Sequence, residues 1–310
     1  MKKIFIDGSV GTTGLRIAER LEQRADLEII RLPEEKRKDD AARKEALNAC
    51  DIAFLCLPDD AAREAVALIE NDSTAVIDTS TAHRTSEGWE YGFAEIGERK
   101  DKIAASKRIA NPGCHASGFV ALVAPLVFAG VIAKSETLSC YSLTGYSGGG
   151  KKMIAEYENE ENKQALQAPR TYGLTQVHKH LPEMAKYCGL ENYPVFCPIV
   201  SSFYSGMEVV VPLTKAQTSA TIEQIKQIYK NYYKGKLVRF CDNADESGFL
   251  SASAFSGFDD MQISVFGNDE RITLVARFDN LGKGASGAAI QNMNILLGKS
   301  EDTGLNLSEE

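Results

Sequence analysis

Residues 3–14 read KIFIDGSVGTTG, an apolar run followed by a glycine-rich turn. The Ile and Phe residues of the run indicate a buried strand, and from residue 15 the apolar side chains have helical spacing. A glycine-rich turn between a strand and a helix is typical of dinucleotide binding, because glycines let backbone N–H groups approach a pyrophosphate at the helix N-terminus. A tight structural turn is the alternative. The predicted cofactor-binding residues of this turn are Gly8, Ser9, Gly11, Thr12, Thr13 and Gly14.

The chain before residue 80 repeats this alternation of strand and helix. Short runs rich in Ile, Leu, Phe and Val indicate buried strands, and apolar residues at helical spacing lie between them. Such alternation predicts a Rossmann-like parallel sheet with right-handed crossovers. The predicted strands are Lys3–Ile6, Leu27–Leu32, Ile52–Leu57 and Ala75–Ile77, and the predicted helices are Leu15–Leu21, Ala41–Asn48 and Ala61–Ile69.

The pattern changes after residue 114, where an apolar helix over 116–129 is followed by longer strand-like runs. With a hairpin turn at Phe266–Asp269, these runs predict an α/β substrate domain with a mostly antiparallel or mixed sheet. The predicted strands are Glu136–Leu143, Val195–Val200, Met207–Leu213, Met261–Phe266 and Ile272–Phe278, with helices at Met153–Asn162 and Thr221–Tyr233. We expect a dinucleotide-binding domain over 1–113, joined by a C-terminal helix over 285–298, a catalytic and oligomerisation domain over 114–284, and a tail over 299–310 that frays.

Composition excludes several classes of protein. The 310 residues carry a net charge of −8 with basic and acidic residues interspersed, which argues against a nucleic-acid partner. No apolar run is long enough to span a membrane, and the N-terminus lacks the pattern of a signal peptide. The 7 cysteines include no CxxC pair, which fits a reducing compartment without disulfides or a zinc site. We therefore expect a cytoplasmic protein with no bound metal.

The end of the second predicted strand indicates which dinucleotide binds. An NAD enzyme usually has an acid there to hold the ribose 2′-hydroxyl. Here Arg31 occupies that place and Lys36, Arg37 and Lys38 follow, although Glu34 and Glu35 lie nearby. A guanidinium suits a 2′-phosphate, so the sequence favours NADP; a solvated Arg31 is the alternative.

The stretch Asn111-Pro112-Gly113-Cys114 contains the predicted nucleophile. Pro and Gly form a sharp turn and the apolar helix begins at once, which places the Cys114 sulfur at a helix N-terminus. The helix dipole and free N–H groups at that position lower the pKa of a thiol. A buried structural cysteine is the alternative interpretation.

A thiolate nucleophile commonly has a basic partner. His115 is next to Cys114 in sequence, a position that does not by itself give productive geometry. The segment from His178 to Glu183 reads HKHLPE and supplies two histidines with an acid that could orient one of them. If the segment is extended, both side chains share a face, and Pro182 disfavours a helical Leu181. We assign the base to His178, with Glu183 folding back to fix its tautomer, and substrate binding to His180; the reverse assignment stays open.

Together these motifs resemble the N-acetyl-γ-glutamyl-phosphate reductase family of arginine synthesis. The Asn111–Cys114 turn, the HKHLPE segment, Asp279–Gly287, Gly8–Gly14 and Asp78–Arg84 all carry the resemblance, which extends from residue 2 to about residue 298. The length is typical of the shorter of the family's two types. His115 and Ser117 stand where the longer type has an aromatic residue and a threonine, and Thr81–Arg84 also departs from that type.

The resemblance implies a mechanism and further site residues. The Cys114 thiolate would attack the γ-acyl phosphate of N-acetylglutamate and expel phosphate, and NADPH would reduce the thioester to the semialdehyde. The family also implies a homo-oligomer, often a tetramer. The negative charges of the substrate need cationic contacts. The segment 147–152 could close over the bound substrate or be a plain connector. The implied residues are Ser80 and Asn280 for the cofactor, and Arg84, Asn111 and Arg170 for the substrate; Asn280 could instead serve helix packing, and either Arg could be a surface residue.

Other functions stay open at this stage. An aspartate-semialdehyde dehydrogenase or an aminoadipyl-phosphate reductase would use the same chemistry on an acyl phosphate of another length. A non-catalytic NADP-sensing regulator would keep the fold, but it has no use for a low-pKa thiol facing a base.

Overall fold

The computed structural model of the chain describes residues 1–309. The chain forms two compact units, one of residues 1–112 with 285–305 and one of residues 113–284 with the chain from 306 onward. Each unit is described by itself below.

The first unit is a parallel sheet with helices on both faces. Among the described residues, its strands follow the order β2-β1-β3-β4-β6-β5, and every pairing is parallel. Side chains of α1, α4 and α9 pack on one face, around Ile4, Phe54 and Ile77, and those of α2 and α3 on the other, around Phe5 and Leu55. The bounds are β1 Lys2–Asp7, β2 Leu27–Ile30, β3 Ile52–Leu55, β4 Ala75–Asp78, β5 Glu90–Tyr91, β6 Arg108–Ala110, α1 Thr12–Leu21, α2 Asp40–Ala49, α3 Asp59–Ala67, α4 Arg99–Ala105 and α9 Gly287–Leu296.

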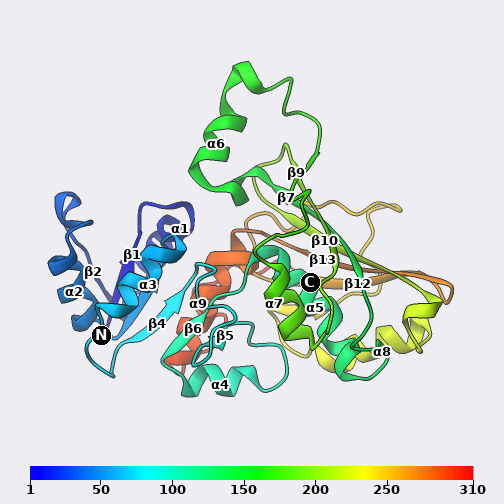
Figure 1. The fold of residues 1–310 in the computed structure, drawn as a ribbon, viewed down its shortest axis with the longest axis horizontal. Coiled ribbons are helices and arrows are strands. Elements are labelled where there is room, and N and C mark those ends of the chain that lie inside the picture. The colour runs from blue at the N-terminus through cyan, green and yellow to red at the C-terminus, as the bar shows by residue number, and fades with distance from the viewer. Residues whose placement is uncertain (310) are drawn as a thin grey trace. The chain divides into compact units, whose positions relative to one another are not determined.

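The second unit contains a mixed sheet. Its described strands follow the order β11-β12-β13-β10-β7-β9-β8; β7 with β9 and β11 with β12 are parallel pairs, and the other pairs are antiparallel. Helices α5 and α8 contact the sheet, α7 packs on α5, and α6 projects from the β7–β9 end (Figure 1). The bounds are β7 Ser139–Gly145, β8 Arg170–Thr171, β9 Val195–Ser201, β10 Met207–Thr214, β11 Val238–Phe240, β12 Met261–Asn268, β13 Arg271–Phe278, α5 Cys114–Phe128, α6 Gly150–Glu158, α7 Leu181–Cys188 and α8 Ile222–Tyr232.

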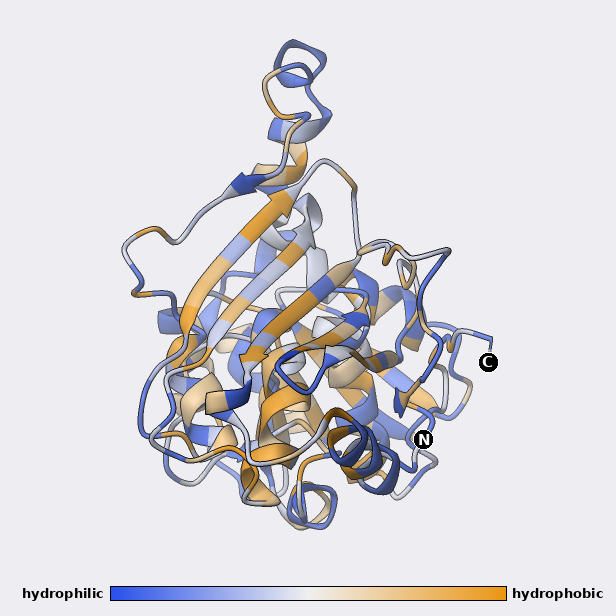
Figure 2. Ribbon diagram, turned by 90° about the vertical axis from the view of Figure 1, so that its right-hand side faces the viewer, coloured by the Kyte–Doolittle hydropathy of each residue, from blue (hydrophilic) through white to orange (hydrophobic). Residues whose placement is uncertain are grey.

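One face of this mixed sheet is turned away from the helices. On β7, Ser142 points to α5, so its neighbours Tyr141 and Leu143 lie on the opposite face. Tyr141 is 47% exposed there, and Val195 of β9 is 48% exposed. Figure 2 shows strands of this sheet, partly orange, facing the viewer with no helix in front of them.

The predicted α/β fold class is confirmed, and the long elements lie within a few residues of their predicted bounds. The predicted hairpin joins β12 to β13, with Asn268 Oδ1 accepting from the N–H groups of Glu270 and Arg271. The sequence analysis did not identify β5, β6, β8, β11, α4 and α7. Most of these are strands of two or three residues, too short for a readable period.

Three local expectations were wrong. The segment from Ser147 is not a plain loop: Tyr146–Gly149 forms a 3₁₀ turn and α6 begins at Gly150. Leu181 opens α7 although Pro182 follows it, since a proline in the first turn loses no helical hydrogen bond. The tail is held rather than frayed, because Asp259 Oδ2 accepts from Asn306 N–H at 2.9 Å and Asp260 Oδ1 from Ser308 N–H at 2.9 Å.

Candidate active site

The glycine turn after β1 has the backbone of a phosphate-binding loop. Gly8 has φ of +87°, and a Cβ there would lie 2.3 Å from the Cys56 carbonyl oxygen. A Cβ on Gly14 would lie 2.4 Å from the Gly8 carbonyl oxygen. Gly11 donates its N–H to that carbonyl at 3.0 Å, and α1 begins at Thr12. The glycines therefore let β1, the turn and α1 pack closely, with the helix N-terminus at the turn.

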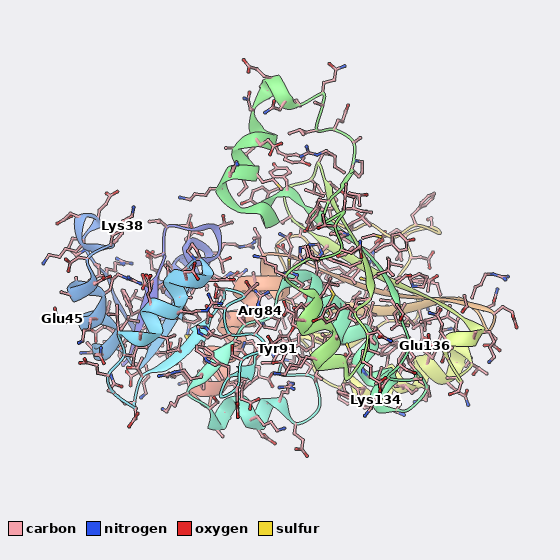
Figure 3. All side chains as sticks on the ribbon, in the orientation of Figure 1. Lys38, Glu45, Arg84, Tyr91, Lys134 and Glu136 are labelled. Carbon is pink, nitrogen blue, oxygen red and sulfur yellow. The ribbon has the colours of Figure 1, made fainter. Side chains whose placement is uncertain are left out.

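The same turn fits a bound dinucleotide. The Thr12 hydroxyl is buried and has no hydrogen-bond partner within residues 1–309, a state that a phosphate oxygen would relieve. Beside it a pocket of about 620 Å³ is lined by residues of β1, β2 and the turn. Arg31, Arg37 and Lys38 line that pocket together with acidic residues, and Arg31 forms an exposed ion pair with Glu22. Lys38 lies just before α2 (Figure 3).

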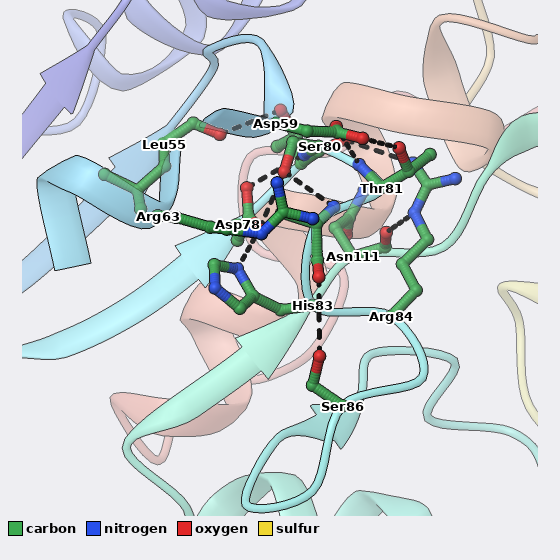
Figure 4. A network of polar contacts seen from close by, with 12 residues as sticks. Leu55, Asp59, Arg63, Asp78, Ser80, Thr81, His83, Arg84, Ser86 and Asn111 are labelled. Atoms are coloured by element: carbon green, nitrogen blue, oxygen red, sulfur yellow. Dashed lines mark hydrogen bonds and ion pairs between the residues drawn. The ribbon is translucent and has the colours of Figure 1, made fainter. Parts of the chain in front are cut away.

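Ser80 belongs to a buried polar network at the carboxyl end of β4 (Figure 4). Asp78 accepts hydrogen bonds from the Ser80 backbone N–H at 2.9 Å and from its hydroxyl at 2.8 Å. His83 Nδ1 lies 2.6 Å from the same carboxylate, and its ring stacks on Trp89 with centroids 4.0 Å apart. The predicted role of Ser80 in cofactor binding stays a prediction.

Arg84 and Asn111 are buried within the first unit, and their contacts there are structural. Arg84 donates from Nε to the Asn111 carbonyl at 2.9 Å and from Nη2 to the Thr79 carbonyl at 3.1 Å (Figures 3 and 4). The Asn111 amide donates to the Ala285 carbonyl at 3.0 Å and accepts from Asn292 at 3.1 Å. Their predicted roles in substrate binding stay predictions, while these bonds hold the turn that precedes Cys114.

Cys114 is the first residue of α5, as its sequence context predicts. Its side chain is half-buried, whereas residues 115–127 of the helix are all buried. A Cβ on Gly284 would lie 2.9 Å from the Cys114 Cβ, so only glycine permits this approach. Glu183 accepts the Gly113 N–H at 3.1 Å, which ties α7 to the turn before the thiol.

His115 is buried, and each of its ring nitrogens has a hydrogen-bond partner. Nδ1 lies 2.6 Å from the Ser142 hydroxyl, and Nε2 lies 2.7 Å from the Tyr172 hydroxyl. Burial, and secondly the charge of His178, lowers the pKa of His115 to about 3, so the ring is neutral at physiological pH. Burial and the Cys114 charge raise the pKa of Tyr172. The Tyr172 phenol is therefore a neutral group, hydrogen-bonded to His115.

The two histidines of HKHLPE lie against His115. The ring centroids of His178 and His180 are 4.7 Å apart, and they are 5.8 Å and 5.6 Å from that of His115. His180 donates its backbone N–H to His178 Nδ1 at 3.2 Å. The structure thus brings Cys114, both histidines and Glu183 together around the N-terminus of α5.

Arg170 and Asn280 have partners within the second unit. Arg170 donates to the Tyr157 hydroxyl at 3.0 Å, and its guanidinium lies over the Tyr157 ring. Asn280 accepts the Gly206 N–H at 2.9 Å and donates to the Ser147 hydroxyl at 3.0 Å. Their predicted roles, in substrate binding and nicotinamide binding, stay predictions.

The sequence analysis missed Tyr172 and Ser142. Neither lies in a motif, and each meets His115 only because β7 and the segment after β8 pack on α5. The one available signal was that a histidine directly after the nucleophile must be buried with the helix and needs polar partners.

The other cysteines give a contrast to Cys114. Burial raises the pKa of Cys50 and of Cys56 to about 12, and it also raises the pKa of Cys140 and Cys188. Within residues 1–309 no group of three or more His, Cys, Asp or Glu side chains is placed to hold a metal ion. No helix in that range is long and apolar enough to cross a membrane.

Comparison with known proteins defines the class. Residues 3–105 match the family described as "Semialdehyde dehydrogenase, NAD binding domain", and residues 114–280 match "Semialdehyde dehydrogenase, dimerisation domain". Aspartate semialdehyde dehydrogenase II from Vibrio cholerae, solved "complexed with ASA", has the same fold, with a TM-score of 0.72 at 17% identity over 96% of this chain and 98% of that one. The enzyme from Candida albicans, solved "with NADP", gives 0.69 at 17% over 96% and 98%. The fold is that of a semialdehyde dehydrogenase.

Full-length relatives narrow this class. N-acetyl-gamma-glutamyl-phosphate reductase 2 from Nostoc sp. is 45% identical over 98% of this chain and 99% of its own length. The reductase from Sinorhizobium medicae is 46% identical over 95% and 98%. The chain belongs to the N-acetyl-gamma-glutamyl-phosphate reductase family, a family of oxidoreductases.

Proposed function

We propose that this chain reduces N-acetyl-γ-glutamyl phosphate to N-acetylglutamate semialdehyde and phosphate, a step of arginine synthesis. The observation that carries the proposal is the thiol at the N-terminus of α5, in a chain 45% identical to a reductase of that name. His178 and His180 pack against His115, the residue next to this thiol. Family membership alone does not define pocket length, so the substrate needs its own test.

The cysteine performs the covalent step. The Cys114 thiolate attacks the acyl carbon, a C–S bond forms, and the C–O bond to phosphate breaks with the electron pair leaving on phosphate. When bound, the reduced nicotinamide supplies the hydride that reduces the thioester. The C–S bond then breaks and the aldehyde leaves while Cys114 returns to the thiolate. The positive end of the α5 dipole stabilises the sulfur charge at the beginning and end of this cycle.

The cofactor we propose is NADP. The turn Gly8–Gly14 would hold the pyrophosphate, with the Thr12 hydroxyl as an additional donor. Arg31, Arg37 and Lys38 line the adjoining pocket and would favour a 2′-phosphate. Ser80 and Asn280 would contact the nicotinamide half, and Arg84, Asn111 and Arg170 the substrate.

The proton carrier is one of the two histidines of HKHLPE. The sequence analysis assigned this role to His178, with Glu183 as its orienting acid. One contact favours His180 instead, since His178 Nδ1 accepts from His180 N–H. Because its Nδ1 lone pair accepts this bond, neutral His178 carries its hydrogen on Nε2, and an Nε2–H suits a hydrogen-bond donor to substrate. We therefore propose His180 as the base and His178 as a substrate-binding donor.

The active form we propose is a homo-oligomer, with a tetramer as the family's common state. The open face of the mixed sheet carries Tyr141 and Val195, both nearly half exposed, and residues 114–280 match a dimerisation domain. A second copy would cover such a face. Light scattering should show an assembly larger than one chain, and Tyr141→Glu should dissociate it.

The test of the proposed reaction uses its reverse direction. Purified protein given N-acetylglutamate semialdehyde, phosphate and NADP should produce NADPH, and omission of phosphate should stop turnover. Aspartate semialdehyde and the one-carbon-longer aminoadipate semialdehyde serve as competing substrates. A preference for either one assigns the chain to that chemistry, and NADPH binding without turnover of any of them would support the sensing alternative.

A further inference from the structure

The carboxyl end of β1 carries a buried ion pair that has no role in the mechanism above. Asp7 is the last residue of β1, and its side chain is 6% exposed. Its Oδ2 accepts two hydrogen bonds from the Arg43 guanidinium of α2, at 3.1 Å from Nε and 2.9 Å from Nη2. The third nitrogen of Arg43, Nη1, donates to Asp40 Oδ1 at 3.0 Å. Because burying charges costs free energy even when they are paired, this pair calls for a reason other than stability.

The strand and the helix direct the two side chains toward each other. Phe5 and Asp7 are two residues apart on β1 and therefore lie on the same face of the sheet. Phe5 belongs to the apolar cluster that includes Leu47 of α2. Arg43 lies one turn before Leu47 on that helix, and both are buried. The carboxylate of Asp7 therefore points to α2, where the guanidinium meets it.

Asp7 also lies at the turn that we propose for the dinucleotide. It directly precedes Gly8, the first residue of that turn, and it lines the pocket of about 620 Å³ that Gly8 and Ser9 also line. Arg43 is not among the described residues that line this pocket. The acidic member of the pair is thus next to the ligand, and the basic member lies behind it. A carboxylate without its partner there would repel a pyrophosphate, because like charges interact strongly in a partly buried site.

Arg43 is the group that balances the charge of Asp7. Within residues 1–309 the charged groups that act on this carboxyl are Arg43 and Asp40, both of α2, and the Gly8 N–H also favours its charged form. Burial raises the pKa of Asp7 above its ordinary value, and the guanidinium opposes that rise. Cys56 donates its backbone N–H to the Asp7 carbonyl, but burial raises the pKa of its thiol to about 12, so the thiol is neutral.

We propose that Arg43 is a positioning residue for cofactor binding, which neutralises Asp7 and so lets the turn Gly8–Gly14 accept the pyrophosphate of NADP. Arg43 acts through Asp7 and does not itself contact the cofactor. This inference rests on the proposed NADP site, but NADP binding can be measured without acyl substrate and hence apart from the reductase reaction.

The first experiment measures the Kd of NADP for the full chain by calorimetry at pH 7.5. Arg43→Met should raise the Kd about tenfold or more, the effect of one unbalanced charge near a polyphosphate. Asp7→Asn should lower the Kd a few-fold, and the double variant Asp7→Asn/Arg43→Met should return it to near the wild-type value. Arg43→Lys keeps the charge and should keep most of the affinity. Lys44→Ala, which removes an exposed cation of the same helix, is the matched control.

A pH series separates the charge of Asp7 from a role in packing alone. In Arg43→Met the carboxyl keeps a raised pKa and loses the cation that opposes the rise. At pH 5.5 it should be protonated for the most part and bind NADP nearly as the wild type does, and the Kd should rise as the pH is raised to 8.5 and the carboxyl ionises. The double variant should lack this rise. The 2′-phosphate of NADP titrates alike with every protein, so its effect cancels in the comparison.

A wild-type Kd in Arg43→Met at pH 7.5 overturns the inference, and so does a double variant that does not recover. Weakened binding at every pH from 5.5 to 8.5 would assign Arg43 to packing. Since Arg43→Met leaves a buried carboxylate unpaired, circular dichroism checks its folding, and Asp7→Asn gives an independent result: tighter NADP binding supports the inference and weaker binding contradicts it.

These outcomes differ from a failure of the proposed reaction. If the Kd values shift as expected in a chain that does not reduce N-acetyl-γ-glutamyl phosphate, Arg43 has the role inferred here and the proposed function fails. If the wild-type chain is an active reductase and all the variants bind NADP equally well, the function stands and the inference about Arg43 fails.

Discussion

Helices α1 and α5 both begin at glycine-containing turns, and they differ in what surrounds the turn. Helix α1 buries only Gly14, Ile17 and Leu21 and faces a pocket of about 620 Å³. Helix α5 is buried along 115–127, and only Cys114 at its start is half-exposed. Both helix N-termini favour negative charge. The N-terminus of α1 faces a pocket that can accept a ligand's phosphate, whereas that of α5 acts first on the charge of its own side chain, Cys114.

The largest effect on turnover should come from Cys114, the first residue of α5. Cys114→Ser removes the thiolate, and a serine hydroxyl is far too weak an acid to replace it, so turnover should fall at least about a thousandfold. Folding should hardly change, because the substitution alters one half-buried atom. Initial rates measure the loss of turnover. Circular dichroism is the folding control, and Cys197→Ser is the matched cysteine control. Wild-type rates in Cys114→Ser would rule out the covalent mechanism.

The next effect separates the two histidines. If His180 is the base, His180→Asn should lower turnover roughly a hundredfold, on the scale of lost general-base catalysis, and slow Cys114 alkylation near pH 7. His178→Asn should mainly raise KM for the aldehyde. Steady-state kinetics and Cys114 alkylation rates of both variants show which histidine is the base. Normal alkylation in His180→Asn with slow alkylation in His178→Asn would return the base to His178, as the sequence analysis had it.

A smaller effect is expected at the open N-terminus, where each contact is one of several. Arg31→Ala should raise the KM for NADP about tenfold to a hundredfold, from the loss of one charge-assisted contact worth roughly 1.5–3 kcal/mol. The KM for NAD should hardly move. Lys44→Ala is a matched control, since it removes an exposed cation of α2 whose ion pair with Glu70 lies away from this pocket. Equal effects on both cofactors would show that Arg31 is structural.

The sequence predicts the two helix N-termini, but it does not predict the long-range contacts around them. Both turns could be read because glycine, proline and the following helix are neighbours along the chain. The hydrogen bonds of the two residues beside Cys114 could not be read, since Glu183 reaches Gly113 across 70 positions and Tyr172 reaches His115 across 57. A local rule also disfavoured a helical Leu181, the residue at which α7 begins. Pairings of this kind depend on how strands and helices pack, which no periodicity encodes.

The smallest effect is on the free energy of unfolding, and it follows from the burial of His115 at the start of α5. His115 is buried as a neutral ring with its pKa lowered to about 3, whereas an unfolded histidine titrates near 6.5. Above that pH neither state binds the proton, so the stabilisation by the neutral ring is complete. As pH falls below about 6.5 the unfolded state takes up a proton that the folded state refuses, and the free energy of unfolding decreases.

His115→Gln should remove this dependence, because glutamine does not titrate. From pH 7.5 to pH 5 wild-type should lose on the order of 1 kcal/mol more unfolding free energy than the variant, and at most about 2 kcal/mol for a single proton. Urea unfolding at fixed protein concentration, followed by circular dichroism, measures the difference, and all other titrating groups cancel between the two proteins. Parallel pH profiles would mean that folded His115 takes up its proton near pH 6.5, and so that the start of α5 is as open to solvent as that of α1.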